Sequence, residues 1–477
     1  MLLRKESLPK CRNQGASTVI GRSKQGVEDS PGYIAEERQT RHLQQRWGWV
    51  EETIWTENML KALVNGVKGG KWFSLIDKVH RTQTLESAWT TVRRNKGAAG
   101  VDGLSIKQVD RNPSKHLEEL QRQLQTGTYR PKPVKRVLIP KGEGKARPLG
   151  IPTVIDRVAQ MAVKLAIEPI FENEFLSMSY GFRPGRGAKD ALRKVDQCLK
   201  EGLVWVVDAD LQAFFDTIPH DRLMARVERH ISDGNILKLL KLWLKQEVMS
   251  SMKTWVPKEG SPQGAVISPL LANLYLHDLD QLIASHGAQM VRYADDFVIL
   301  CASESEAQAA LSVVKQWVEE NKLTLHPEKT HLGNCQIEGQ GFEFLGYRFE
   351  GGTRWVRQKS ILKFREGIRA RTRRTCGSCM EAVIARLNPM LKGWYNYFKH
   401  VDKWGLERFD SFVRRRLRAI LRKNEKRPSF GASLDDHRKW PNAFFANLGL
   451  FSMEQSRKQE LAQQSLNGTY QLESRMR

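Results

Sequence analysis

The chain has 477 residues, of which 40% are hydrophobic, and it carries a formal net charge of +24. This length predicts three or four structural units, and the basic excess indicates a polyanionic partner. The six scattered cysteines argue against a disulfide framework, and no apolar run approaches the ~20 residues that a membrane helix needs. We therefore expect a cytoplasmic protein without a membrane partner.

The first 130 residues divide into two parts. Residues 1–45 are polar, lack periodicity and are expected to form a disordered basic leader. Residues 46–130 contain short amphipathic patterns and a glycine-rich loop at 95–103. A helix is expected to begin at Asn112-Pro113, with a polar cap and a proline in its first turn, and to end near Gly127.

Residues 131–352 mix strand and helix patterns. Val134 to Pro140 reads as a strand, with a basic turn and a returning strand at 148–151. Helical periodicity follows in several segments, and strands are expected near 339–349. The expected helices cover residues 154–175, 187–200, 221–230, 236–246, 266–285 and 303–321.

Two short acidic segments in this region carry the chemistry. The apolar run 203–207 leads into Asp208 and Asp210, and Asp295 and Asp296 occupy a turn between two apolar segments. A strand end and a hairpin turn that meet side by side would bring these carboxylates together. Such a set can bind two Mg²⁺ ions about 3.5–4 Å apart, which is the arrangement used in phosphoryl transfer. Asp208 shares a strand face with Asp210 but should lie deeper, so Asp210 is the better metal ligand.

The C-terminal part is strongly basic. Residues 363–427 hold 19 Lys/Arg and 6 Asp/Glu, a net charge of +13, together with aromatic side chains that can stack on bases. We expect basic helices over 360–427 with an interruption at Pro389, and an apolar segment at 440–451 that packs. Cys376 and Cys379 have metal-ligand spacing, but no second pair lies nearby, so zinc is not expected.

These motifs resemble the reverse transcriptases encoded by bacterial group II introns. Tyr293-Ala-Asp-Asp296 is similar to motif C, and Asp210 with Phe214-Phe215-Asp216 is similar to motif A. Further blocks resemble the family in the right order, from about residue 95 to residue 451. They are Asn95–Gly103, Lys141–Ile151, Ser179–Arg186, Ser261–Gly264 with Ile267–Leu271, Leu325–Thr330, Phe344–Tyr347 and Gly393–Phe398.

The resemblance implies an α+β right-hand polymerase, with fingers and palm around an antiparallel sheet and an all-helical thumb. The implied units are a leader (1–45), an N-terminal extension (46–130), fingers and palm (131–352), domain X, which is the thumb and maturase region (353–430), and a C-terminal tail (431–477). The implied function is RNA-directed DNA synthesis coupled to maturase activity, which assists splicing and mobility. The implied partners are a group II intron RNA, an RNA template with a DNA primer, dNTPs and target DNA.

The family's site residues carry over to matching positions. Asp210, Asp295 and Asp296 are the implied catalytic and metal-binding residues, with Leu211 as a further metal contact and Mn²⁺ as a substitute for Mg²⁺. The implied nucleotide-binding residues are Lys141, Arg147, Phe215, Gln263 and Lys329. The implied nucleic-acid contacts are Arg183, Arg186, Gly264, Lys392, Trp394, Arg414, Arg415, Arg416 and Arg418.

Three alternatives stay open at this point. The chain could be a splicing-only maturase, whose signature would be loss of Asp295 or Asp296, and both are present. It could be a retron or CRISPR-associated reverse transcriptase, which is not expected to carry the Gly393–Phe398 block. A viral-type RNA-dependent RNA polymerase would usually have Gly-Asp-Asp in its hairpin. Because His437 stands alone near the C-terminus, without the HNH residues and paired CxxC motifs of many relatives, we expect no endonuclease domain.

Overall fold

The structure is a computed structural model that describes residues 43–463, except 68, 143–144, 252, 376, 402–404 and 428–430. Most of the expected leader, residues 1–42, lies outside the described residues, as does Cys376. Residues 43–47 are helical, and Leu43 and Trp47 are buried in the core. The expected leader therefore extends too far, since its last three residues belong to the folded part.

The N-terminal helices pack around one buried helix, α8 (Val154–Glu174). The Asn112 side chain caps α7 by accepting a hydrogen bond from the Lys115 amide, and Pro113 occupies the first turn, as the sequence predicted. Buried leucines of α7 and α5 join the same core as α8. The N-terminal extension thus shares its core with the fingers and palm. Its helices are α3 (Glu57–Asn65), α4 (Ile76–Val79), α5 (Thr82–Asn95), α6 (Ile106–Val109) and α7 (Pro113–Gln125).

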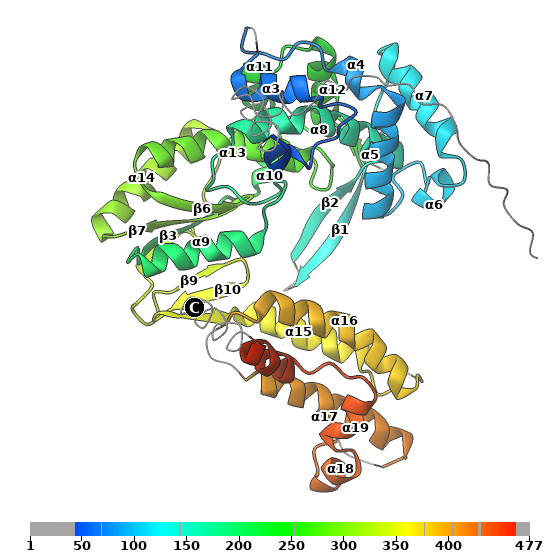
Figure 1. Ribbon diagram of the computed structural model, residues 1–477, viewed down its shortest axis with the longest axis vertical. Coiled ribbons are helices and arrows are strands. Elements are labelled where there is room, and N and C mark those ends of the chain that lie inside the picture. The colour runs from blue at the N-terminus through cyan, green and yellow to red at the C-terminus, as the bar shows by residue number, and fades with distance from the viewer. Residues whose placement is uncertain are drawn as a thin grey trace, which may run out of the picture.

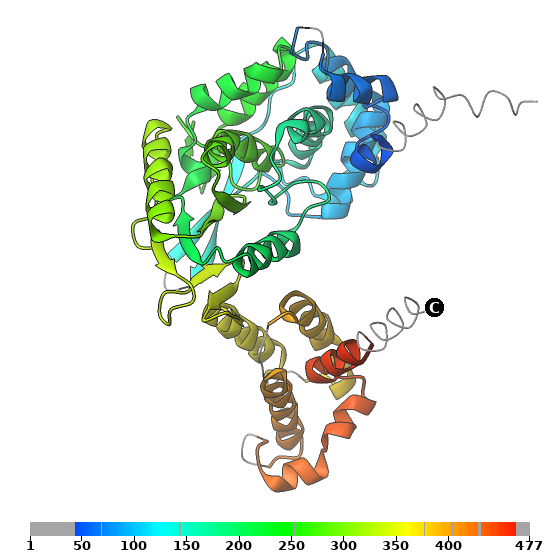
Figure 2. The same cartoon turned by 60° about the vertical axis from the view of Figure 1, so that its left-hand side comes forward.

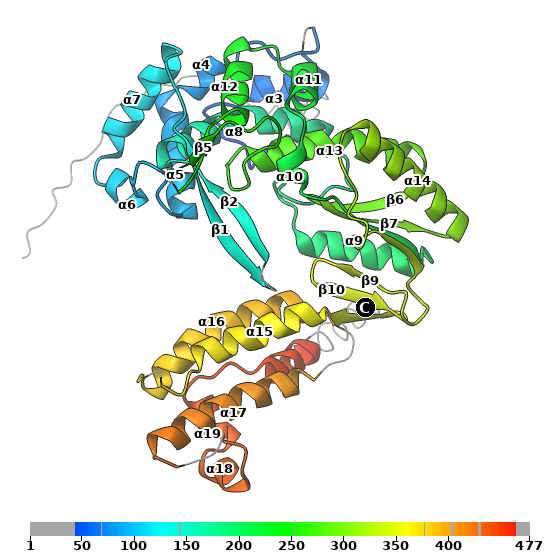
Figure 3. The ribbon, with the colours of Figure 1, turned by 180° about the vertical axis from the view of Figure 1, so that it is seen from behind.

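A long hairpin extends from these helices toward the C-terminal helices (Figures 1 and 3). It is formed by β1 (Val134–Gly142) and β2 (Lys145–Ile151). Next to β1 lie two strands of three residues each, β4 (Val248–Ser250) and β5 (Lys253–Trp255), in the sheet order β2-β1-β4-β5. The sequence did not predict β4 and β5, because three residues are too few to show a strand pattern.

The central sheet has the order β6-β7-β3-β8 with antiparallel neighbours. One face packs on the large core with α13 (Ser268–Ser285) and α14 (Glu304–Glu320), and α9 (Ala188–Lys200) belongs to the core on the opposite face (Figure 1). The strands are β3 (Trp205–Asp210), β6 (Gln289–Tyr293), β7 (Asp296–Cys301) and β8 (His331–Asn334). The remaining helices of this region are α10 (Phe214–Thr217), α11 (His220–His230) and α12 (Gly234–Leu244).

A small sheet, ordered β11-β10-β9, leads from the palm into the C-terminal helices (Figure 2). Its strands are β9 (Phe342–Phe344), β10 (Tyr347–Glu350) and β11 (Thr353–Val356). The helices are α15 (Gln358–Arg371), α16 (Met380–Phe398), α17 (Leu406–Asn424), α18 (Leu434–Lys439) and α19 (Asn442–Asn447). The architecture confirms the expected α+β fold with a helical C-terminal region.

One of two expectations about the C-terminal region was wrong and the other is confirmed. Pro389 does not interrupt the helix, because α16 continues through it while Leu387 and Leu391 stay buried on its inner face. The apolar segment expected to pack at 440–451 does so, since Trp440 and Phe445 are buried against the other C-terminal helices. Among the described residues, no helix is long and apolar enough to cross a membrane.

Candidate active site

The antiparallel pairing of β3 with β7 brings two of the predicted carboxylates together. Asp210, the last residue of β3, is the register partner of Asp296, the first residue of β7. Asp208 lies two residues before Asp210 and therefore on the same face of the sheet. Asp295 belongs to the turn that joins β6 to β7. The predicted meeting of the two acidic segments is thus present in the fold.

A buried arginine holds the turn that carries Asp295. Arg292 is 0% exposed and donates to Asp280 at 2.7 and 2.5 Å, forming an ion pair inside the protein. The same guanidinium donates to the Asn273 side chain and to the main-chain carbonyl of Ala294, both at 2.9 Å. Ala294 has a positive φ of 62°, a conformation that costs energy for a residue with a Cβ. The Arg292 network therefore stabilises a strained turn, and sequence reasoning missed it.

A glycine packs closely against the same turn. An ideal Cβ on Gly181 would lie 2.4 Å from the Ala294 nitrogen and 2.9 Å from the Tyr293 carbonyl carbon. The Gly181 carbonyl also accepts a hydrogen bond from Asn273 at 2.7 Å. Any side chain at position 181 would push the turn away, so glycine is needed here for close approach.

The crowding of carboxylates shifts their titration. Burial, together with the neighbouring charges of Asp210 and Asp295, raises the pKa of Asp296 to about 7. Burial also raises the pKa of Asp208 to about 7, with Asp296 as the next cause. Arg357 and Lys329 act in the opposite direction at Asp296. The group therefore carries more negative charge than its protein neighbours neutralise.

This charge arrangement fits divalent cations. Oxygen ligands at crowded, partly buried carboxylates are what Mg²⁺ prefers, and a divalent ion would relieve their mutual repulsion. Lys329, which forms an ion pair with Asp210, shows that a positive charge is accommodated there. Within the described residues, however, no three His, Cys, Asp or Glu side chains are arranged as a ready metal cluster. Leu211 has a buried apolar side chain, so only its main-chain carbonyl has a ligand atom to offer.

A cavity of about 530 Å³ opens beside these carboxylates, and we call it the carboxylate cavity. Asp210 and Asp295 line it from the palm, and Arg147 lines it from the fingers hairpin. The other residues that line it are Ala146, Pro148, Leu211, Gln212, Ala213, Phe214, Phe215, Gln263, His326, Lys329 and Lys359. Four of the five predicted nucleotide-binding residues therefore meet in one place. The fifth, Lys141, lies in β1 close to the hairpin tip, and its side chain is outside the described part, so its role stays a prediction.

Gln263 connects the two sides of this cavity. Its Oε1 accepts a hydrogen bond from Arg147 Nε at 2.7 Å, and its Nε2 donates to Asp216 Oδ2 at 3.4 Å. Its main-chain carbonyl accepts a bond from the Gly150 amide at 2.7 Å. Gln263 therefore ties the fingers hairpin to the short helix α10 that follows Asp210.

The two adjacent phenylalanines differ in their surroundings. Phe214 is 2% exposed and lies 6.3 Å from the Tyr275 ring, inside the large core. Phe215 is 8% exposed, and its ring meets Phe214 edge to face at 5.5 Å. Both line the cavity, and Phe215 is the more accessible of the two.

Comparison with known proteins identifies the chain. Residues 139–349 match the model described as reverse transcriptase (RNA-dependent DNA polymerase), and residues 361–440 match the group II intron maturase-specific domain. The protein YkfC of Escherichia coli is 33% identical over 315 residues, which cover 57% of this chain and 82% of YkfC. The chain belongs to the group II intron reverse transcriptase/maturase family. The activity of this family is RNA-directed DNA polymerisation. The chain combines a reverse transcriptase domain with a maturase-specific domain.

Other relatives of this reverse transcriptase are matched over smaller shares. The group II intron-encoded protein LtrA of Lactococcus lactis subsp. cremoris is 36% identical over 197 residues, or 41% of this chain and 33% of LtrA. Among solved structures, a chain of a partial Cas6-RT-Cas1–Cas2 complex is 26% identical and covers 52% of this chain and 41% of that one. Its TM-score with this chain is 0.33. The maturase match at 361–440 includes the Gly393–Phe398 block that separated this family from the retron and CRISPR alternatives.

Two of the expected nucleic-acid contacts in the palm and one in the loop before α13 make structural contacts within the protein. Arg183 has a side chain that is 2% exposed, and its guanidinium pairs with Glu172 at 2.6 Å, so this expectation was wrong. Arg186 is half-buried and donates to the Ser177 carbonyl at 2.8 Å. Gly264 has a φ of 110°, and a Cβ there would lie 2.4 Å from the Gly150 carbonyl. The close packing of this loop on β2 is therefore enough to require a glycine at position 264.

The thumb residues separate into buried and exposed sets. Arg418 is 2% exposed and donates to the Trp440 carbonyl at 2.9 Å and to Asn442 at 3.0 Å, so the expectation that it contacts nucleic acid was wrong. Arg416 is half-buried and donates to the Thr372 carbonyl at 2.7 Å. Trp394 stacks on Phe364 at 4.3 Å with an angle of 14°, which makes it a packing residue. Arg415 and Lys392 are exposed, and Arg414 is partly exposed.

Sequence reasoning missed two cations at the palm–thumb junction. Lys359, in the first turn of α15, lines the carboxylate cavity. Arg357 lies beside Asp296 and 3.6 Å from Glu343, and its amide donates to the Gly346 carbonyl at 2.9 Å. His326 also lines the cavity, and its amide donates to the Asp210 carbonyl at 2.8 Å. No local signal marks Lys359 among the many basic residues of its segment.

Proposed function

We propose that the carboxylate cavity is the site where this reverse transcriptase joins a dNTP to a DNA primer on an RNA template. The proposal rests on one observation above all. Asp210 and Asp295 line the same cavity as Arg147, although they come from three segments that are far apart in the chain. Negative groups that bind metal and a positive group that binds phosphate are the two halves of a nucleotidyl-transfer site.

Asp210 and Asp295 would hold two Mg²⁺ ions, with Asp296 and the Leu211 carbonyl as supporting contacts. Bound in this way, the metal ions would activate the primer 3′-hydroxyl and neutralise the leaving pyrophosphate. Mn²⁺ would be an acceptable substitute, because it also favours oxygen ligands. The Arg292 network sets the position of the turn before Asp295 and thereby the separation of the two carboxylate groups.

The other cavity residues would bind the nucleotide. Arg147 is oriented by Gln263, so its guanidinium is ready to grip triphosphate oxygens. Lys141 would add a second charge at the hairpin tip. Phe215 would lie next to the sugar and exclude a 2′-hydroxyl. Lys329 would exchange its ion pair with Asp210 for the phosphates and could donate a proton to pyrophosphate as it leaves.

The thumb would hold RNA through exposed arginines. Arg415 on α17 and Arg369 on α15 lie 5.6 and 5.8 Å from the Phe412 ring, and Arg365 lies 6.0 Å from it. Cations gathered around one aromatic ring are held in place without being neutralised, so they remain available to phosphates. We propose that this cluster, with Arg414 and Lys392, binds template–primer duplex and the group II intron RNA, and that target DNA follows the same path.

Replacing the turn carboxylate tests the proposal. Asp295→Ala should abolish extension of oligo(dT) on poly(rA) with Mg²⁺, because it removes one of the two principal metal ligands. RNA binding measured by filter retention should stay within about twofold, since Asp295 lines the carboxylate cavity whereas the arginine cluster surrounds Phe412 on α15 and α17. Asp221→Ala, at an exposed position of α11, is the matched control and should behave as the parent protein. Undiminished extension by Asp295→Ala would overturn the assignment. A parent protein that binds RNA but extends no primer would favour a splicing-only maturase.

A further inference from the structure

The turn between β9 and β10 is held by two helices of the thumb. Its central residues, Leu345 and Gly346, have positive φ values of 49° and 84°, which is the conformation of a tight hairpin turn. At the start of α15, the Arg357 amide donates to the Gly346 carbonyl at 2.9 Å. At the end of α16, the Tyr397 hydroxyl donates to the Leu345 carbonyl at 2.8 Å. The turn is therefore fixed between the beginning of one thumb helix and the end of the next.

A second tyrosine makes the contact with α16 reciprocal. The Tyr347 hydroxyl, from β10, donates to the Tyr397 carbonyl, and the two rings lie 5.9 Å apart. Burial, together with Tyr293 and Asp296, raises the pKa of Tyr397 to about 12. Burial also raises the pKa of Tyr347 above its usual value. Both hydroxyls therefore stay protonated at neutral pH and keep their protons to donate.

The small sheet that this turn closes reaches the carboxylates of the palm. Asp208 accepts a main-chain hydrogen bond from Glu343 in β9. The Glu343 carboxylate lies 3.6 Å from the Arg357 guanidinium, which is beside Asp296. A shift of the turn would therefore move groups that surround the carboxylates.

The helices that hold the turn also carry the arginines that we propose bind RNA. Trp394 of α16 stacks on Phe364 of α15 at 4.3 Å, so the two helices pack together as one unit. Arg365 and Arg369 belong to the same helix as Phe364. A duplex held by these arginines is thus connected to the palm through the β9–β10 turn.

A segment outside both matched domains supports the end of α16. Residues 453–463 are helical and follow the maturase-specific domain in the chain. Arg457 donates to the Lys399 carbonyl at 2.9 Å, which satisfies a carbonyl at the C-terminal end of α16. Glu460 pairs with the Lys399 ammonium group at 2.9 Å. Asp410 of α17 is 3% exposed and accepts hydrogen bonds from the first two amides of the segment, which anchors its beginning.

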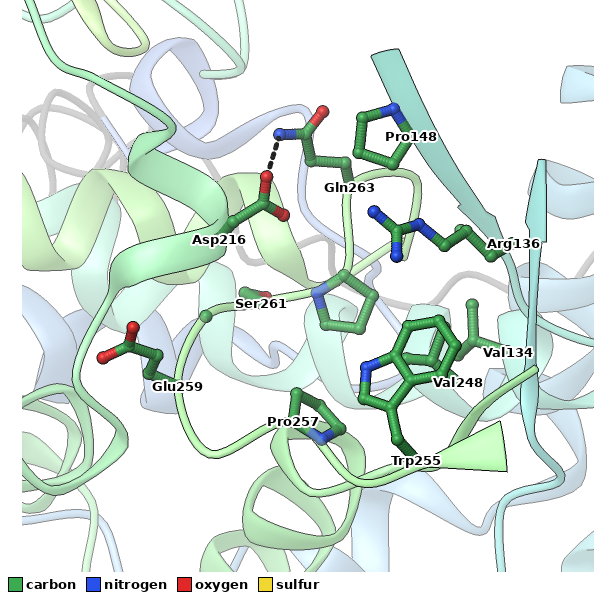
Figure 4. Close-up of a pocket in the computed structure, with 13 residues that line it drawn as sticks. Val134, Arg136, Pro148, Asp216, Val248, Trp255, Pro257, Glu259, Ser261 and Gln263 are labelled. Carbon is green, nitrogen blue, oxygen red and sulfur yellow. Dashed lines mark hydrogen bonds between the residues drawn. The ribbon is translucent and has the colours of Figure 1, made fainter. Parts of the chain in front are cut away.

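We propose that Tyr397 is a positioning residue for DNA synthesis, because its hydroxyl holds the β9–β10 turn against the thumb, and that residues 453–463 keep the end of α16 in place for this contact. Through it, the thumb that grips the duplex sets where the primer end meets the carboxylates. The inference rests on the proposed function, since it takes the carboxylate cavity as the site of reaction. The nucleotide side of that site is built separately, because Gln263 connects the fingers to Asp216, as Figure 4 shows. A defect at Tyr397 should therefore slow the chemical step and leave nucleotide affinity intact.

Removing one hydroxyl tests the proposal. Tyr397→Phe keeps the ring and loses the bond to Leu345. We would measure single-turnover addition of one dNTP to a DNA primer on an RNA template, with the active fraction determined by titration. The rate constant should fall about tenfold, because a small misplacement of reacting groups is costly, whereas the Kd for dNTP and for primer–template should stay within about twofold. Tyr347→Phe should act in the same way, and the double variant should lose less than the product of the two single losses.

Tyr275→Phe is the matched control. It removes the same kind of bond, from a buried tyrosine hydroxyl to the Asn321 carbonyl at 2.9 Å, within the palm core. It should lower stability to a similar degree and leave the rate constant of the active fraction unchanged. An equal fall in the rate constant in Tyr275→Phe and Tyr397→Phe would overturn the proposal, since general loss of stability would then explain both. A parent-like rate constant in Tyr397→Phe would overturn it as well.

Exchanging the charges of the Lys399–Glu460 pair tests the support by residues 453–463. Glu460→Lys should slow the chemical step about twofold to fivefold, the range for a partly exposed ion pair, and adding Lys399→Glu should restore it. A parent-like rate constant in Glu460→Lys, or a failure of the exchange to restore the rate, would overturn this part of the proposal.

Hydrogen exchange gives a readout that does not depend on catalysis. The amides of residues 344–357 should exchange faster in Tyr397→Phe than in the parent protein, and at the parent rate in Tyr275→Phe. Unchanged exchange in Tyr397→Phe would overturn the proposed contact. If the parent protein extends no primer, the proposed polymerase site fails, whereas the exchange rates still report whether Tyr397 holds the turn.

Discussion

Asp210 and Asp296 face each other as register partners across β3 and β7, and Lys329 forms an ion pair with Asp210. Asp208 adds a third carboxylate on the same sheet face, and it is buried, with an exposed fraction of 9%. A sheet edge of this kind is costly for a folded protein without a cation. The protein therefore gives up stability at the place where we propose that it binds metal.

The titration of Asp208 leads to a prediction on stability. Burial raises its pKa from 3.8 to about 7, so the folded state is penalised once this carboxylate ionises. The penalty is absent below about pH 4, grows as pH rises, and is complete above pH 7. Asp208→Asn should therefore raise the free energy of unfolding in EDTA by at most about 4 kcal/mol at pH 8, and by less at pH 5. Thermal unfolding at the two pH values measures this.

Asp221→Asn, at an exposed position, serves as the control for this measurement. Added Mg²⁺ should stabilise the parent protein more at pH 8 than at pH 6, because ionised carboxylates bind the metal more tightly. A gain from Asp208→Asn that is the same at pH 5 and pH 8 would contradict the assignment of the raised pKa.

The contact between Gly181 and the Asp295 turn predicts an effect on both stability and activity. Gly181→Ala would place a Cβ 2.4 Å from the Ala294 nitrogen, so the turn must move. We expect a loss of about 1–3 kcal/mol of stability and a loss of primer extension of at least about tenfold. Denaturant unfolding and single-nucleotide extension rates measure the two effects.

Gly187→Ala is the matched control, because a Cβ there would approach nothing closer than 3.8 Å. It should cost at most about 1 kcal/mol and leave extension nearly unchanged, since Gly187 precedes α9 and is remote from the turn. Equal effects of the two substitutions would mean that the turn tolerates displacement and that Gly181 does not position Asp295.

The greater exposure of Phe215 predicts that it, and not Phe214, rejects ribonucleotides. Phe215→Ala should lower the ratio of kcat/KM for dNTP over rNTP by at least about tenfold, because we propose that this ring lies next to the sugar and excludes the 2′-hydroxyl. Phe214→Ala should mainly destabilise the fold, since this ring is buried against Tyr275. If Phe214→Ala changes the ratio and Phe215→Ala does not, the assignment is off by one residue.

The arginine cluster around Phe412 predicts the salt dependence of RNA binding. Replacing Arg369 and Arg415 with Gln should reduce the slope of log Kd against log salt by about 1.4–1.8, the value for two phosphate contacts. Lys238→Gln with Lys315→Gln, at two exposed positions outside the thumb, should change the slope little. The same reduction in both double variants would show that total charge, and not this cluster, sets the slope.

Local sequence patterns were enough to predict many of the helices and strands and the positions of the central carboxylates. The apolar run before Asp210 predicted β3, the two apolar segments around Asp295 predicted the hairpin, and the helix expected over residues 303–321 is α14. These features depend on neighbours within a few residues, so they can be read along the chain. The family resemblance placed Arg147 and Gln263 in the same site, and the structure places both on the carboxylate cavity.

The tertiary structure alone decided which charged residues are exposed. In the sequence, nothing distinguishes Arg183 and Arg418 from the basic residues around them. In the fold, each is buried and bound by residues from another segment of the chain. Lys359 lines the carboxylate cavity from α15, whereas the other residues that line it come from the fingers and palm. Trp255 borders a cavity only because β1 and β2 form its other wall. Burial and proximity depend on contacts between distant segments, and a local pattern carries no record of those contacts.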